Sequence, residues 1–267
     1  MRRHLTLGLT VASLVLLNAA TLPAQQAGQA ANPQAWHGAL PQGSTIEIKG
    51  VNGEIHASAA SGSEVEVSAV MKGRKSNPAD VRLDIVQHAD GVTICAMYPS
   101  PDGRPNECQP GDAGRMNVRD NDVTVTFTVH VPAGVRFAGR TVNGNIEAEN
   151  LDAPVAVQTV NGDVTFSTRA YGTASTVNGT VRGAMGSATW TDAVKIHTVN
   201  GSVSLDLPAD TSTDLNAATV NGSIASDFPV TVSGRIGRQR LNGTIGSGGR
   251  SLQIETVNGS ITLRKRD

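Results

Sequence analysis

Charged residues, aromatic residues and cysteines are all scarce in this chain of 267 residues. Charged residues make up 17% of the sequence and aromatic residues 3%, and there are two cysteines. The 22 Lys and Arg nearly balance the 23 Asp and Glu. Proteins that bind nucleic acid or anionic membranes through charge need clustered Lys and Arg. We therefore predict no nucleic-acid partner.

Sequence signatures of catalysis and of metal binding are also missing. The chain has no Gly-x-Ser-x-Gly motif, no phosphate loop and no pair of histidines at ligand spacing. Polysaccharide-active β-helix enzymes need paired carboxylates about 5 to 9 Å apart, and Asp163 is the one acidic residue that follows a Thr-Val-Asn-Gly motif. We predict a protein that is not an enzyme and has no metal or other cofactor. A polysaccharide-active β-helix enzyme is the alternative.

The one long apolar run lies at the N-terminus. Met1 to His4 is basic, Leu5 to Leu17 carries no charge, and small residues continue to Ala24. This layout is typical of a cleaved signal peptide, and the run is shorter than the roughly 20 residues that a permanent transmembrane helix needs. We predict a signal peptide over residues 1–24. The protein is then exported, periplasmic or extracellular, with no stable membrane insertion after cleavage.

The two cysteines, Cys95 and Cys108, are close in sequence, and the stretch between them is rich in proline. In an oxidising compartment such a pair is expected to form a disulfide. The bridge would close a short loop and stabilise the fold by roughly 3 kcal/mol on the chain-entropy model.

The mature chain alternates apolar and polar residues, which is the period of half-buried strands. Residues 25–43 lack this period and are predicted to be a disordered leader. Segments such as Glu64 to Val70 and Val123 to Val131 alternate clearly. We predict an N-terminal β-rich section over residues 44–135 and a repeat section over residues 136–267.

The repeat section contains six copies of Thr-Val-Asn-Gly, and each is followed by a polar residue and then Ile or Val. Leu241-Asn-Gly243 and Val51-Asn-Gly53 are degenerate copies. Successive asparagines are 16 to 22 residues apart, and they are Asn143, Asn161, Asn178, Asn200, Asn221, Asn242 and Asn258.

Two architectures suit this repeat. Asn-Gly is a strong hairpin signal because both residues accept φ > 0 in a type I′ turn, so a meander of hairpins is possible. A hairpin, however, does not require the preceding Thr and Val, whereas a solenoid stacks equivalent residues about 4.8 Å apart. We favour an all-β, single-stranded β-helix-like solenoid with valines in the core and a ladder of asparagines. In chain order, Asn200 would lie between Asn178 and Asn221.

The serial motif also resembles a known bacterial group. Gly50-Val-Asn-Gly-Glu-Ile55, Val131-Pro-Ala-Gly134 and the repeats after them are similar to the bacterial family of "putative adhesins", also called the toastrack domain. The resemblance covers the chain from about Ser44 to Leu263. It implies a single-stranded β-helix-like fold, and it implies no characterised reaction.

These features predict an exported, non-enzymatic repeat scaffold with adhesin-like binding at the cell envelope. The partner would be an envelope glycan or another envelope protein, and a purely structural envelope domain is the alternative. The hydroxyl-bearing residues after the motif, Thr180, Ser202 and Ser223, form one candidate binding face. Tyr171 and Trp190, in the variable segments between motifs, are candidate stacking residues.

Overall fold

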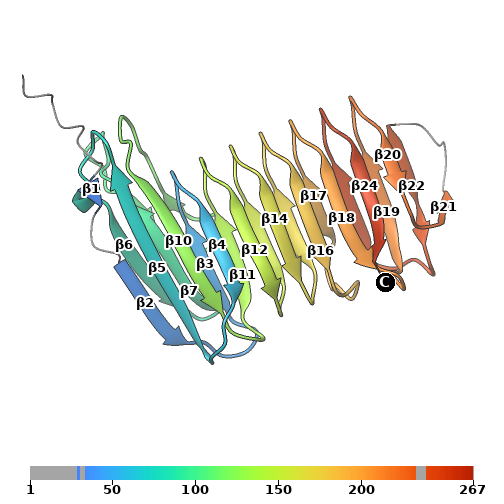
Figure 1. The fold of residues 1–267 in the computed structure, drawn as a ribbon, viewed down its shortest axis with the longest axis horizontal. Helices are drawn as coiled ribbons and strands as arrows, with labels where there is room; N and C mark the ends of the chain where they lie inside the picture. Colours follow the sequence, from blue (N-terminus) through green and yellow to red (C-terminus); the bar gives the residue numbers. More distant parts are fainter. Residues whose placement is uncertain (1–28, 31–33, 233–238, 267) are drawn as a thin grey trace, which may run out of the picture.

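The computed structural model describes residues 29–30, 34–232 and 239–266. It contains two 11-stranded sheets that enclose one apolar core. Their strands follow one another along the long axis of the molecule (Figure 1). No helix in the described ranges is long and apolar enough to cross a membrane. The predicted signal peptide lies outside the described residues.

Each coil of the stack contributes one strand to each sheet, and Thr-Val-Asn-Gly makes the turn between them. Neighbouring coils pair in parallel in both sheets. The coils from residue 136 onward are β11 (Arg136–Arg140) with β12 (Ile146–Leu151), β13 (Val155–Gln158) with β14 (Val164–Thr168), β15 (Gly172–Ser175) with β16 (Val181–Met185), and β17 (Val194–His197) with β18 (Val203–Pro208). The predicted solenoid is therefore confirmed.

The backbone at the motifs rules out the hairpin meander. A type I′ turn needs φ > 0 at both central residues. Asp120 and Asn150 are the only residues other than glycine with positive φ in the described part of the chain. The motif asparagines are not among them, because each motif links two sheets rather than two antiparallel neighbours.

The coils are not stacked in chain order at the C-terminal end. The coil of β23 (Ser251–Glu255) and β24 (Ile261–Arg266) inserts between β17/β18 and the earlier coil of β19 (Thr213–Ala218) and β20 (Ile224–Ser226). Figure 1 shows red β24 between β18 and β20. Asn200 thus lies between Asn178 and Asn258, and the prediction that placed Asn221 beside it is wrong. Because every motif offers the same backbone partners, the repeat does not encode its position in the stack.

The predicted boundary at residue 135 does not separate two bodies. The coil of β3 (Thr45–Lys49) and β4 (Ile55–Ala59) pairs in parallel with β11 and β12. The strands beyond it pair mainly in antiparallel fashion and end the stack. They are β1 (Gln29–Ala30), β2 (Gln34–Ala39), β5 (Glu64–Gly73), β6 (Arg82–His88), β7 (Gly91–Met97) and β10 (Thr124–Val131), with a 3-10 turn at Pro78–Asp80.

The prediction of a disordered leader over residues 25–43 is wrong for β2. This strand pairs with β5 over six residues, Trp36 opposite Val67. Trp36 packs against the core although the surrounding sequence is polar. Pairing with an otherwise open sheet edge supplies the backbone hydrogen bonds that this short segment could not form alone.

The asparagine side chains form a continuous hydrogen-bonded ladder. In each step the Nδ2 of one asparagine donates to the Oδ1 of the asparagine before it in the stack, at 2.7 to 2.9 Å, and every step runs in the same direction. The order in space is Asn52, Asn143, Asn161, Asn178, Asn200, Asn258 and Asn221. Asn52 thus extends the predicted ladder.

Asn242 does not belong to the ladder. It lies within β22 (Arg240–Ile245), opposite Asn216 in an antiparallel pair. Its Oδ1 is buried without a hydrogen-bond partner. The degenerate copy at Leu241-Asn-Gly243 has lost the threonine that fixes the other motifs, and β22 pairs instead with β19 and β21 (Val230–Val232) as a terminal cap.

The threonine and the glycine of the motif have separate roles. The six threonines are buried, and each donates its Oγ1 hydrogen to the carbonyl of the motif glycine on the adjacent coil at 2.8 to 3.1 Å. A Cβ on the motif glycines would lie only 1.9 to 2.1 Å from the carbonyl oxygen of the next glycine. Glycine is required because the coils approach this closely, and threonine satisfies the carbonyls that the close approach buries.

The ladder predicts how Asn200 variants behave. Asn200→Ala removes two hydrogen bonds, to Asn178 and Asn258. The amides are exposed, so the cost in unfolding free energy is about 1 to 2 kcal/mol. Asn200→Gly should lower the free energy of unfolding in urea by at least as much, because it removes the same side-chain amide. Asn216→Ala, an exposed strand residue outside the ladder, is the matched control. Rescue by glycine would show that the turn backbone alone is important.

Candidate binding groove

The valines of the motif form a partly exposed row along one corner of the solenoid. In spatial order they are Val51, Val142, Val160, Val177, Val199, Val257 and Val220. Val142 and Val177 are each 39% exposed and Val220 is 56% exposed. The prediction that these valines point into the core is wrong, because the preceding threonine takes the inward position. We call these seven residues the valine row.

A second row lies beside the valine row on the outer face of the sheet that contains β11, β13, β15 and β17. It consists of the residue before each motif, and the strand register aligns these residues across neighbouring strands. We call it the polar row: Lys49, Arg140, Gln158, Ser175, His197, Glu255 and Ala218.

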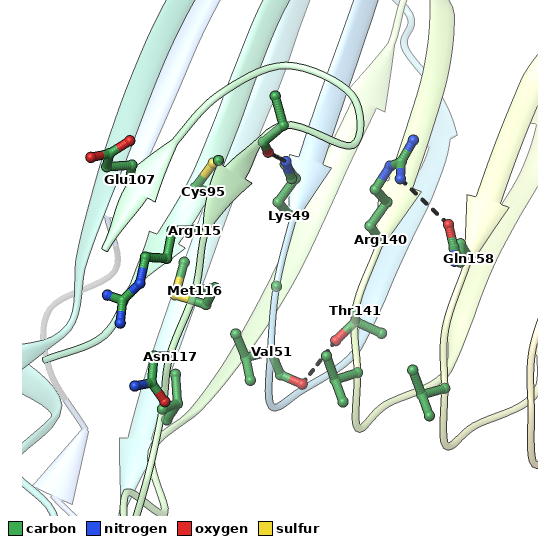
Figure 2. A pocket seen from close by; sticks show the side chains of 16 residues that line it. Lys49, Val51, Cys95, Glu107, Arg115, Met116, Asn117, Arg140, Thr141 and Gln158 are labelled. Atoms are coloured by element: carbon green, nitrogen blue, oxygen red, sulfur yellow. Dashed lines mark hydrogen bonds between the residues drawn. The ribbon is translucent and has the colours of Figure 1, made fainter. Parts of the chain in front are cut away.

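Three cavities of about 460, 400 and 450 Å³ follow the polar row. The first and the middle cavity share Arg140 and Gln158, and the middle and the third share His197. Members of the valine row line the first and third cavities. Together the three form an elongated depression, which we call the groove. Figure 2 shows the first cavity, with Arg140 beside Gln158 on adjacent strands.

The disulfide loop forms one wall of the first cavity. Cys95 and Cys108 are bridged, as predicted, with their Cα atoms 5.8 Å apart. The loop continues through β8 (Glu107–Cys108) and β9 (Gly114–Arg115). Lys49 Nζ donates to three loop carbonyls at 2.8, 2.8 and 2.9 Å, those of Gln109, Gly111 and Ala113. Burial lowers the pKa of Lys49, and the charge of Glu47 partly opposes this.

Glu47 anchors the same loop from beneath. It is 5% exposed, and its Oε2 accepts from Thr93 Oγ1 and from the Gly111 N–H, both at 2.9 Å. Its Oε1 lies 3.1 Å from Arg140 Nε, and Arg140 also pairs with Asp112 in the loop. The buried Glu47 carboxylate is thus both paired and hydrogen-bonded, and it ties the loop to the sheet through the Gly111 N–H.

The predicted face of Thr180, Ser202 and Ser223 lies on another row, at the start of the strands that follow the motif. Ser202 and Ser223 are exposed and Thr180 is half-buried. Ser260 lies between the two serines: its N–H donates to Ser202 Oγ at 3.2 Å, and its Oγ accepts from the Ser223 N–H at 3.3 Å. None of the three predicted residues lines the groove.

Tyr171 and Trp190 come together, but not as an exposed stacking platform. Their ring centroids are 6.4 Å apart in an edge-to-face arrangement. Trp190 is 3% exposed and belongs to the core, and Tyr171 is half-buried against it. Trp190 is therefore a core residue and not an exposed stacking residue. The pair covers the core beside the connection between β16 and β17, which is longer than the connections on either side of it, from β14 to β15 and from β18 to β19.

The groove was not predicted from the sequence. The sequence does contain a feature that marks it: the residue before each motif changes from coil to coil, whereas the motif stays the same. In the described ranges, no group of three or more His, Cys, Asp or Glu is placed to hold a metal ion.

The geometry defines an all-β solenoid with serial coils and a groove along one face. The family described as Toastrack DUF4097 matches residues 40–264. The chain belongs to this family, as the resemblance of its motifs predicted. A comparison with curated proteins found no match.

Several solved structures are similar to this chain. A "putative cell adhesion protein" from Clostridium sporogenes ATCC 15579 is 11% identical, with 88% of this chain and 100% of that chain covered and a TM-score of 0.48. A "putative adhesin" from Bacteroides fragilis NCTC 9343 is 12% identical, with 88% and 97% covered and a TM-score of 0.32. A "putative lipid binding protein" from Parabacteroides distasonis ATCC 8503 is 10% identical, with 88% and 97% covered and a TM-score of 0.22. Likeness at this level carries no functional information.

The disulfide predicts the thiol chemistry of the purified protein. Denatured but unreduced protein should not react with a maleimide, and two thiols should react after reduction. The Cys95→Ala/Cys108→Ala variant should lose up to about 3 kcal/mol of unfolding free energy. Lys49 should still hold the loop to the sheet, so the variant should give the wild-type circular dichroism spectrum. Two reactive thiols before reduction would contradict the bridge.

Proposed function

We propose that this protein is an exported, non-enzymatic scaffold that binds an extended polymer of the cell envelope along the groove. The observation that carries the proposal is the continuity of the groove over successive coils. Parallel strands repeat at about 4.8 Å, so each coil offers the groove one contact position at a regular interval. A repetitive, elongated ligand can use many such contacts at once, whereas a small molecule uses one cavity.

A glycan suits both kinds of surface in the groove. The C–H faces of sugar rings can pack on the valines of the first and third cavities. Sugar hydroxyls can bond to Gln158, Ser175 and the other polar side chains of the middle cavity. This chemistry does not need stacking on Tyr171 and Trp190.

Export is supported by the disulfide, which persists in oxidising compartments, and by the signal-peptide layout of residues 1–24. The periplasm and the cell exterior both satisfy these conditions. The proposed partner is therefore a component of the envelope.

The absence of turnover is part of the proposal. Two carboxylates line the groove, Glu107 in the first cavity and Glu255 in the third. The strands between these cavities hold them much farther apart than the roughly 5 to 9 Å of a glycosidase pair. Bound glycan should therefore be released uncut.

Blocking the groove should abolish binding. Ala156 is exposed on the outer face of β13 and lines the middle cavity. Ala156→Trp should prevent co-sedimentation with peptidoglycan sacculi and binding to a bacterial glycan array. Ala184→Trp, on the outer face of β16 in the other sheet, is the matched control and should bind normally. Incubation with wild-type protein should release no new reducing ends.

The predicted face is tested by the Thr180→Lys/Ser202→Lys/Ser223→Lys variant. This variant should bind normally if the groove is the site. Loss of binding here, with normal binding by Ala156→Trp, would move the site to the predicted row. A folded wild-type protein that binds neither sacculi nor any arrayed glycan would support the purely structural role.

A further inference from the structure

Cations outnumber carboxylates among the residues that line the groove. Five Lys or Arg line its three cavities, against two Glu. The whole chain has a formal net charge of −1. The cations are Lys49, Arg115, Arg140, Lys195 and Arg240. An elongated site with an excess of one charge sign attracts ligands of the other sign.

Several of these cations are already engaged within the protein. Lys49 is held by three loop carbonyls. Arg115 pairs with Asp102 at 2.5 Å, and Arg140 pairs with Glu47. Lys195, by contrast, forms no ion pair with any carboxylate in the described part of the chain. Its charge is therefore available to a ligand.

The middle cavity around Lys195 has no carboxylate in its lining. Lys195 and His197 project from the outer face of β17, and Ser175 lies opposite His197 on β15. Thr173, Ser175 and Gln158 add hydroxyl and amide donors. The small side chains of Ala156 and Ala193 leave room above the sheet. Every polar side chain in the lining can donate a hydrogen bond, and the ammonium group of Lys195 is one of these donors.

We propose that the middle cavity is a subsite for the anionic group of an acidic polymer, a carboxylate or a phosphate, with Lys195 as its main contact. The inference rests on the proposed function, because it assigns the charge of the ligand that lies in the groove. A hydrogen bond between an ammonium and an anion is about twice as strong as a neutral one. Glu255, which lies opposite His197 in the strand register, lines the third cavity and not this one.

The test compares three polymers of different charge. Polygalacturonate supplies carboxylates, poly(glycerol phosphate) supplies phosphates, and dextran is neutral. Titration calorimetry at low salt should show that wild-type protein binds at least one acidic polymer about tenfold more tightly than dextran, as expected for one charge-assisted bond. Raising the salt to 0.5 M should reduce the difference, because salt screens exposed charges.

Lys195→Gln should weaken binding of the preferred acidic polymer about tenfold and leave dextran binding unchanged. The matched control is Lys72→Gln, an exposed strand lysine on β5 in the other sheet, which should bind as wild type does. The preferred polymer, carboxylate or phosphate, identifies the source of the anion.

Two outcomes would overturn the inference and separate it from the proposed function. Equal binding of all three polymers, unaffected by Lys195→Gln but abolished by Ala156→Trp, would leave the groove as a site for neutral glycan. If none of the three polymers binds and peptidoglycan does not bind either, both the subsite and the proposed function are wrong.

Discussion

The close approach between adjacent coils at the motif glycines is the constraint on which the rest of the structure depends. Any side chain there would collide with the carbonyl of the next coil. With the backbones this close, the asparagines bridge in parallel and their amides join into one ladder. The buried carbonyls then require the threonine hydroxyl. Three of the four motif positions thus follow from one distance.

The fourth position explains how a structural repeat can carry a function. With threonine facing inward, the following valine lies at the corner where the chain turns from one sheet to the other, and it is exposed or half-buried there. The valine row is thus a by-product of stacking, and it borders the groove at a fixed spacing. The neighbouring polar row has no role in the stacking of the motifs. Its residues can differ from coil to coil, as Gln158, Ser175 and His197 do, so the scaffold and the groove vary independently.

The sequence allowed most of the fold to be predicted, because the strand period and the repeat are local signals. The asparagine ladder followed from the identity of the motif, and the disulfide followed from spacing and compartment. The direction of the valines could not be deduced in this way, since apolar character alone favours burial and the competing threonine is polar. The position of the coil of β23 and β24 could not be predicted either, because identical motifs do not distinguish Asn221 from Asn258 as the neighbour of Asn200. The groove depends on which residues from distant coils become neighbours, and that information exists only in the assembled stack.

The insertion of β23 and β24 has a consequence for how the chain reaches its native state. The coil of β19 and β20 is synthesised earlier, yet it meets the rest of the stack through a coil made later. A nascent chain that has not yet released residues 251–266 therefore lacks the strands between β18 and β20. Parallel growth of the solenoid from β3 and β4 therefore stops at β17 and β18 until β23 and β24 have been made. The order in which the coils stack thus differs from the order in which they are synthesised, and the coil of β19 and β20 must wait for a later segment before it joins the stack.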